Sequence, residues 1–144
     1  MILPDLNILI HAYNPGSATH PVARTWWEAC LTGNRPVFLP WVVILGFLRL
    51  TTRPLIAANP LPVSEACEIA SSWLARPQVS PLHPGYHHGE ILFDLLRIAG
   101  TGGNLTTDAH LAALAIEHRV ELHTTDSDFS RFPGLWWRNP LVRR

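Results

Sequence analysis

Residues 106–128 read TTDAHLAALAIEHRVELHTTDSD, and this stretch decides the predicted fold. Alanine and leucine recur every three or four residues over 106–118, which predicts a helix with an apolar face. A largely apolar run follows at 120–125 and ends at an aspartate, which predicts a buried strand. A helix that leads directly into a buried strand is typical of a parallel α/β sheet.

The rest of the chain continues this alternation of short strands and longer helices. Strands are predicted at residues 1–4, 37–39 and 79–82, with a last one within 135–141. Helices are predicted at residues 6–13, 19–31, 41–50, 62–74 and 87–98. We therefore predict a single α/β domain over residues 1–144, in three layers (α/β/α), with a central parallel sheet of four or five strands.

Composition narrows the class of protein. With 144 residues, 47% hydrophobic and 15% charged, the chain is expected to be globular. The formal net charge is zero, so any nucleic-acid site must be local. No apolar run reaches the length of a membrane span and no secretion signal is found, so we expect a cytoplasmic protein without a membrane partner. The two cysteines are expected to be buried free thiols.

Four of the eleven acidic residues are predicted to gather at one edge of the sheet. Asp5 follows the first strand, Asp126 and Asp128 follow the strand at 120–125, and Asp108 lies in the first turn of helix 106–118. Parallel α/β sheets form their sites at the carboxyl ends of the strands. Because converging carboxylates repel one another, such a cluster is typical of a cation site. Mg²⁺ or Mn²⁺, which prefer oxygen ligands, fit best.

Each of these acids also has a simpler interpretation. Asp5 and Asp126 precede short helical segments and could cap them. Asp108 could stabilise its helix through the helix dipole alone. The sequence leaves both interpretations open.

Four segments, from the first strand to the end of the chain, resemble PIN-domain ribonucleases, in particular the VapC toxins of toxin–antitoxin pairs. Residues 2–10 (ILPDLNILI) resemble the first PIN motif, and residues 103–115 (GNLTTDAHLAALA) resemble the third. Residues 122–129 (LHTTDSDF) resemble the fourth, and 132–141 (FPGLWWRNPL) resemble the end of many VapC toxins. The resemblance implies a PIN-like fold and a Mg²⁺- or Mn²⁺-dependent endoribonuclease that leaves a 5′-phosphate and a 3′-hydroxyl.

The resemblance also implies roles for individual residues. Asp5, Asp108 and Asp126 correspond to catalytic metal ligands, directly or through water, and Asp128 to an outer ligand or the base that orients the attacking water. Other residues are implied to position the carboxylates or the phosphate: Asn7, Asn104, Thr125 and Arg49. A structural ion pair is an equal alternative for Arg49.

Expected partners are an RNA substrate, a VapB-like antitoxin and a second copy of the chain in a homodimer. All three follow from the resemblance. Adjacent Trp26 and Trp27 cannot both face one buried stripe of a helix. One of them is a candidate for a groove that takes an antitoxin helix or for a dimer contact, with core packing as the alternative.

One position departs from the family pattern. PIN domains usually carry a glutamate a few residues before an arginine on the helix after the second strand, and here Gly46 stands at that place before Arg49. This favours, as an alternative, a catalytically weak PIN-like module that binds RNA or protein. A second alternative is a haloacid-dehalogenase-type phosphoryl-transfer enzyme with Asp5 as nucleophile. That family needs a lysine, and all eleven basic residues of this chain are arginines.

Overall fold

The computed structural model describes residues 1–53 and 59–142. Its centre is a five-stranded parallel sheet in the order β3-β2-β1-β4-β5. The strands are β1 (Ile2–Pro4), β2 (Val37–Pro40), β3 (Val79–Leu82), β4 (Glu121–His123) and β5 (Trp137–Arg138). The prediction of a three-layer domain around a parallel sheet of four or five strands is confirmed.

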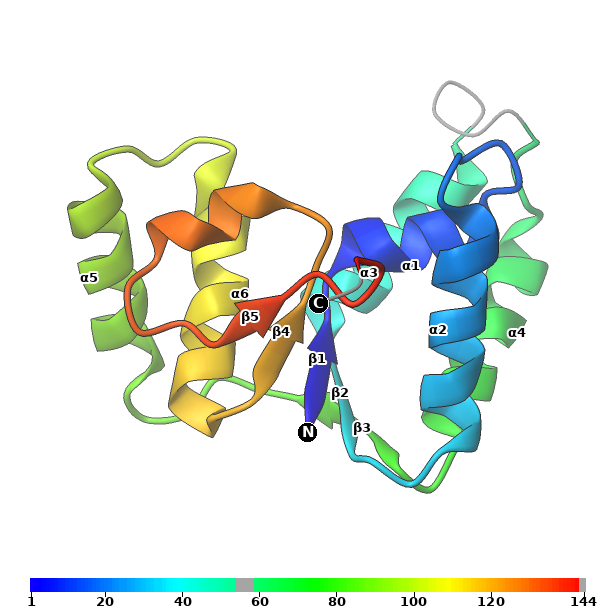
Figure 1. The fold of residues 1–144 in the computed structure, drawn as a ribbon, viewed down its shortest axis with the longest axis horizontal. Coiled ribbons are helices and arrows are strands. Elements are labelled where there is room, and N and C mark those ends of the chain that lie inside the picture. The colour runs from blue at the N-terminus through cyan, green and yellow to red at the C-terminus, as the bar shows by residue number, and fades with distance from the viewer. Residues whose placement is uncertain (54–58, 143–144) are drawn as a thin grey trace.

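Helices cover both faces of the sheet (Figure 1). One side carries α1 (Leu6–Tyr13), α2 (His20–Thr32), α3 (Trp41–Thr52) and α4 (Val63–Leu74), and the other carries α5 (His88–Ala99) and α6 (Leu105–His118). The strand order explains this division. The chain moves outward from β1 to β3 and then returns to β4, so right-handed crossovers place the later helices on the opposite face. A short 3₁₀ helix, η1 (Ser127–Arg131), joins β4 to β5.

The helix boundaries agree with the prediction to within two residues, whereas the last two strands are shorter than predicted. The apolar run at 120–125 contributes only three residues to β4. The chain leaves the strand because the amide of Asp126 turns back to donate a hydrogen bond to Thr124 Oγ1 at 3.0 Å. The strand predicted within 135–141 is reduced to the two residues of β5.

The alanine-rich helix α6 lies between the sheet and α5. Every residue from Leu111 to Ala115 is buried, so the helix has no solvent-facing stripe over that turn. The small side chains allow β4 on one side and α5 on the other to approach closely. This packing fixes the start of α6, and therefore Asp108, relative to the end of β4.

Aromatic side chains form the core on the other face of the sheet. Trp73 is fully buried and makes edge contacts with Phe47 (ring centroids 4.6 Å apart) and Trp27 (5.5 Å). Its indole Nε1 donates a hydrogen bond to Tyr13 Oη at 2.8 Å. The cluster joins α1, α2, α3 and α4, and so holds α1 in place behind Asp5.

Both cysteines are free thiols, as predicted, but only Cys30 is buried. Cys67 is exposed because it lies on the outer side of α4, so the expectation that both thiols are buried is wrong for Cys67.

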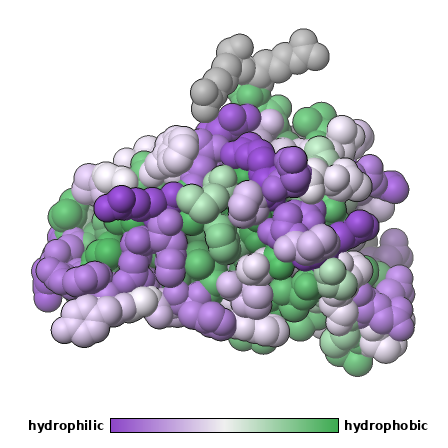
Figure 2. Space-filling view, turned by 90° about the horizontal axis from the view of Figure 1, so that it is seen from below, coloured by the Kyte–Doolittle hydropathy of each residue, from purple (hydrophilic) through white to green (hydrophobic). Residues whose placement is uncertain are grey.

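None of the helices in the described ranges combines the length and hydrophobicity needed to cross a bilayer. At the end of the molecule seen in Figure 2, hydrophobic residues gather near the middle, between hydrophilic ones.

Candidate active site

Asp5 joins β1, β4 and α1 at the carboxyl edge of the sheet. Its amide donates a hydrogen bond to the carbonyl of His123 in β4 at 2.9 Å, which continues the pairing of the two strands. Its carboxylate accepts from the Leu6 amide at 2.7 Å and from Thr124 Oγ1 at 2.8 Å. Asp5 therefore does cap α1, as the simpler interpretation predicted. The cap does not exclude a site, because each carboxylate oxygen keeps a free lone pair.

Thr124 connects the acids and was missed by the sequence analysis, which named Thr125. Thr124 is fully buried, and its hydroxyl accepts from the Asp126 amide while it donates to Asp5. A hydroxyl has a single proton to donate. The shorter contact takes it, so Asn7 Oδ1, 3.4 Å away, makes only a long contact with the same oxygen.

A signal for Thr124 does exist in the sequence. Side chains alternate between the two faces of an extended strand, so residues two apart share a side. Leu122, Thr124 and Asp126 are spaced in this way, whereas Thr125 is displaced by one residue. The spacing therefore favours Thr124, two positions before Asp126, over Thr125 as the supporting residue.

Asp126 and Asp128 stand at the start of η1. The Asp126 carboxylate accepts from the Asp128 amide at 2.9 Å and caps this short helix. Asp126 is half-buried, whereas Asp128 is exposed. The capping interpretation thus holds for Asp126 as well, and the cap fixes the carboxylate beside the end of β4.

The charges of the four carboxylates act on one another. The pKa of Asp108 is raised to about 6, chiefly by burial and in addition by the charges of Asp5, Asp126 and Asp128. The pKa of Asp5 is also raised, chiefly by burial and in addition by Asp126, against the lowering effect of its hydrogen bonds to Thr124 and Leu6. The starts of α1, α6 and η1, which carry or directly follow these acids, lie at the same end of the strands in Figure 1.

The arrangement limits the kind of cation that the acids can hold. Within residues 1–53 and 59–142, no three His, Cys, Asp or Glu side chains lie close enough to bind one ion as they stand. A preformed cage of the zinc type is therefore not present there. The acids offer only oxygen ligands. Such a set fits an ion of the Mg²⁺ class, which binds through one or two carboxylates and keeps several waters.

Other residues named from the sequence are less closely connected to the acids. In the part of the chain that the structure describes, no side-chain hydrogen bond or ion pair involves Arg49, Asn104 or Thr125. Arg49 and Asn104 are exposed and Thr125 is half-buried. The alternative of a structural ion pair for Arg49 finds no partner among these residues.

Gly46 lies against the first residue of α1. A Cβ atom added at this position would overlap Leu6 Cδ2. The leucine that follows Asp5 thus fills the space into which a longer side chain on α3 would begin. A glutamate at position 46, as in the family pattern, would therefore start in space that the Leu6 side chain occupies.

Replacing Thr124 with valine is expected to lower activity at this site by about 10- to 100-fold, as loss of a residue that supports a metal ligand does elsewhere. Valine keeps the volume but leaves Asp5 Oδ2 without a donor and the Asp126 amide without an acceptor. We expect the free energy of unfolding to fall by about 1–3 kcal/mol. Denaturant unfolding and RNA cleavage measure the two effects. Thr124→Ser should keep most of both, and a larger loss in Thr125→Val than in Thr124→Val would contradict the assignment.

Comparison with known families and structures identifies the family of the chain. The chain matches the PIN domain over residues 2–135. Among solved structures, VapBC2 from Rickettsia felis, bound to a DNA fragment from their promoter, superposes with a TM-score of 0.67. The match covers 96% of this chain and 98% of that chain, at 19% identity, which shows a shared fold.

Similarity in sequence is closer to two proteins of Mycobacterium tuberculosis. Ribonuclease VapC33 is 40% identical over 141 residues, which cover 98% of this chain and 99% of the relative. Ribonuclease VapC37 is 41% identical over 140 residues, which cover 97% of each. The chain therefore belongs to the PIN-domain family and, within it, to the VapC group.

Proposed function

We propose that this protein is a metal-dependent endoribonuclease that acts as the toxin of a toxin–antitoxin pair. The observation that carries the proposal is that Asp5, Asp126 and Asp128 lie near enough to Asp108 at one edge of the sheet for their charges to add to the effect of burial, which together raise the pKa of Asp108 to about 6. Two relatives that match almost the whole chain are named ribonucleases, which supports RNA as the substrate. Cleavage leaves a 5′-phosphate and a 3′-hydroxyl, as the family resemblance implies.

In this proposal Asp5, Asp108 and Asp126 hold Mg²⁺ or Mn²⁺, directly or through water. The ion, when bound, neutralises charge on the scissile phosphate and makes a water more acidic. Thr124 and the Leu6 amide fix the Asp5 carboxylate, so its orientation does not depend on the substrate. Asp128 is the one exposed member of the group, and it orients the attacking water and accepts its proton.

The proposed partners are a VapB-like antitoxin and a second copy of this chain. Membership of the VapC group and the shared fold with VapBC2 support the antitoxin. The cytosol is the proposed location, because an enzyme that cuts RNA acts where its substrate is.

Total RNA treated with the purified protein tests the proposal directly. With Mg²⁺ or Mn²⁺ we expect discrete cuts whose ends carry a 5′-phosphate, and EDTA should abolish them. Added antitoxin should also stop cleavage. Absence of cuts, while metal binding remains visible by calorimetry, would favour the binding-module alternative, which rests on Gly46 at the position where PIN domains usually carry a glutamate. The PIN match leaves no place for the haloacid-dehalogenase alternative.

Metal affinity is expected to fall as the pH drops below about 6, because the ion must then displace a proton from Asp108. The loss should approach about tenfold per pH unit for one displaced proton. Metal-free stability should change in the opposite direction. The folded pKa of Asp108 lies above the unfolded value, so its contribution to stability is complete at low pH and is lost as the pH rises through 6.

Calorimetry with Mn²⁺ at pH 5.5, 6.5 and 7.5 measures the affinity, and thermal unfolding in EDTA measures the stability. Asp108→Asn is the matched variant, because it removes the titrating group and keeps the side chain's shape. It should flatten the metal-free pH dependence between about pH 4 and pH 6, the range between the ordinary and the folded pKa of Asp108. An affinity that stays constant over this range in the wild type would show that Asp108 is not displaced by the ion.

A further inference from the structure

A buried pair of polar side chains lies in β4, directly before the acidic edge. Glu121 and His123 are 5% and 2% exposed, and His123 Nε2 lies 2.6 Å from Glu121 Oε1. His123 Nδ1 is buried and has no hydrogen-bond partner within the described ranges of the chain. A proton on Nδ1 would be a buried donor without an acceptor, so Nε2 carries the proton and donates a hydrogen bond to Glu121. No step of the proposed reaction uses either side chain.

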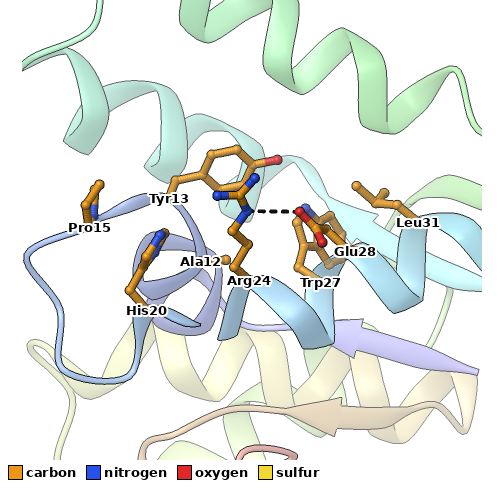
Figure 3. A pocket seen from close by; sticks show the side chains of 8 residues that line it. All are labelled: Ala12, Tyr13, Pro15, His20, Arg24, Trp27, Glu28 and Leu31. Atoms are coloured by element: carbon orange, nitrogen blue, oxygen red, sulfur yellow. Dashed lines mark hydrogen bonds and ion pairs between the residues drawn. The ribbon is translucent and has the colours of Figure 1, made fainter. Parts of the chain in front are cut away.

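Trp26 of α2 covers this pair. Its ring centroid lies 5.6 Å from that of His123. The adjacent Trp27 instead lines a pocket between α1 and α2 (Figure 3). Arg35 and Arg138 lie near enough to His123 for their charges to act on its ring. The pair therefore has an aromatic and charged environment on the face of the sheet that α2 covers.

The pair is not explained by stability alone. Removing two polar groups from water offsets most of their attraction, so a buried pair of this kind contributes little net stability. Apolar residues of similar size would fill the same space at least as well. Buried polar groups can instead specify which of several packings a chain adopts. The residues that follow β4 show which alternative packing has to be avoided.

Two identical residues follow β4, Thr124 and Thr125. Only Thr124 faces Asp5 and donates a hydrogen bond to it. A shift of β4 by one residue along β1 would turn every side chain of the strand to the other face and bring Thr125 to the place of Thr124. The apolar residues of this strand and the two threonines would tolerate such a shift.

Glu121 and His123 would not tolerate it. Side chains alternate between the faces of a strand, so Leu122 points toward α6 while its two neighbours point toward α2. The shift would move both polar side chains against residues 111–115 of α6, which are apolar and buried. The pair would lose Trp26 and the two arginines, and burial of polar and charged groups without their partners is strongly unfavourable.

We propose that Glu121 and His123 are positioning residues, which hold β4 in the register that places Thr124 against Asp5. They act through the backbone, since the carbonyl of His123 accepts from the Asp5 amide at 2.9 Å. The functional part of this inference rests on the proposed ribonuclease, because the place of Thr124 matters for activity only if Asp5 is a metal ligand. The register itself is a property of the fold and is measured without RNA or metal.

The variant E121L/H123F tests the proposal, because it removes both polar groups and keeps apolar side chains of similar size in the strand. Amide hydrogen exchange is followed by NMR in EDTA at Asp5 and Asp126, whose amides donate to the end of this strand. The amide of Val37 in β2 is the reference. We expect exchange at the two aspartates to be about tenfold faster than in the wild type, with Val37 unchanged. The midpoint of denaturant unfolding should be equal or higher.

Glu121→Gln is the matched control. Its amide oxygen still accepts from His123 Nε2, and a buried polar side chain still opposes the shift. It should exchange like the wild type at Asp5 and Asp126. Calorimetry with Mn²⁺ then measures the consequence for the acidic edge. The affinity should fall by about 10- to 100-fold in E121L/H123F and stay close to the wild-type value in Glu121→Gln.

Four results would decide against all or part of this reasoning. Equal acceleration at Val37 and at the two aspartates would show a general loss of stability and overturn the proposal. Unchanged exchange in E121L/H123F would overturn it as well. Faster exchange at Asp5 and Asp126 with unchanged Mn²⁺ affinity would reject the positioning role. A wild type that binds Mn²⁺ but cuts no RNA would reject the nuclease, and exchange and affinity would still decide whether Glu121 and His123 position the acids.

Discussion

Replacing Asp5 with asparagine is expected to abolish RNA cleavage and to leave the fold intact. Asparagine has the same shape, and its carbonyl oxygen can still accept from the Leu6 amide. What is lost is the buried charge that attracts the cation, which is worth a factor on the order of 10³ or more in rate. Because burial raises the pKa of Asp5, its charged form is disfavoured in the folded protein. We therefore expect the metal-free variant to be at least as stable as the wild type at pH 7.

Cleavage of RNA in Mn²⁺ and thermal unfolding in EDTA measure the two effects on the same preparation. Asp94→Asn is the matched control, since Asp94 lies on α5 in an exposed pair with Arg97 and should change neither quantity. Opposite directions of activity and stability in Asp5→Asn would separate a loss of chemistry from a loss of fold. If Asp5→Asn keeps more than a tenth of the wild-type cleavage rate, the assignment of Asp5 as a catalytic metal ligand is wrong.

Replacing Trp73 with alanine is expected to lower the free energy of unfolding by about 3–5 kcal/mol. Trp73 is fully buried, contacts the rings of Tyr13, Trp27 and Phe47, and donates to Tyr13 Oη. The substitution leaves a cavity between four helices that cannot all move inward at once. A loss of this size is a large fraction of the total stability of a typical domain, about 5–15 kcal/mol.

Denaturant unfolding followed by circular dichroism measures this loss. Trp136→Ala is the control, because Trp136 is 64% exposed and its replacement should change stability by no more than about 0.5 kcal/mol. Trp73→Phe keeps an aromatic ring in the cluster and should fall between the two. Equal midpoints for Trp73→Ala and Trp136→Ala would show that the aromatic cluster does not hold the four helices together.

The order of strands and helices and the placement of the aspartates after β1, after β4 and in the first turn of α6 could be predicted because they depend on local patterns. The repeat of alanine and leucine in α6 and the aspartates that end β1 and β4 need no knowledge of distant residues. Thr124 was missed because its role depends on which of two adjacent threonines faces Asp5, and a shift of one residue reverses the face. The contact between Gly46 and Leu6 was not predictable either, because it depends on how α3 lies against α1.

The two adjacent tryptophans illustrate the same limit. The sequence indicates that Trp26 and Trp27 face different directions, but it does not say what each one meets. In the structure Trp27 packs on Trp73 and lines the pocket between α1 and α2. Trp26 contacts the ring of His123 of β4 at a tilted angle and lines a second pocket with Val22 and Pro140. Helical geometry gives the separation of their directions, whereas their neighbours depend on how α4 and β4 pack against α2.

The hydrogen bond between Thr124 and Asp5 spans 119 positions of the chain. During synthesis the first aspartate leaves the ribosome long before its supporting threonine, and Asp108, Asp126 and Asp128 also come late. A nascent chain therefore has no assembled acidic edge until the strand that carries Thr124 has emerged and paired with β1. If the acids cut RNA as proposed, we expect no cleavage of the RNA of the ribosome that makes the chain. Stalled chains that end before residue 121 should accordingly leave RNA uncut, and cleavage by such chains would contradict this consequence.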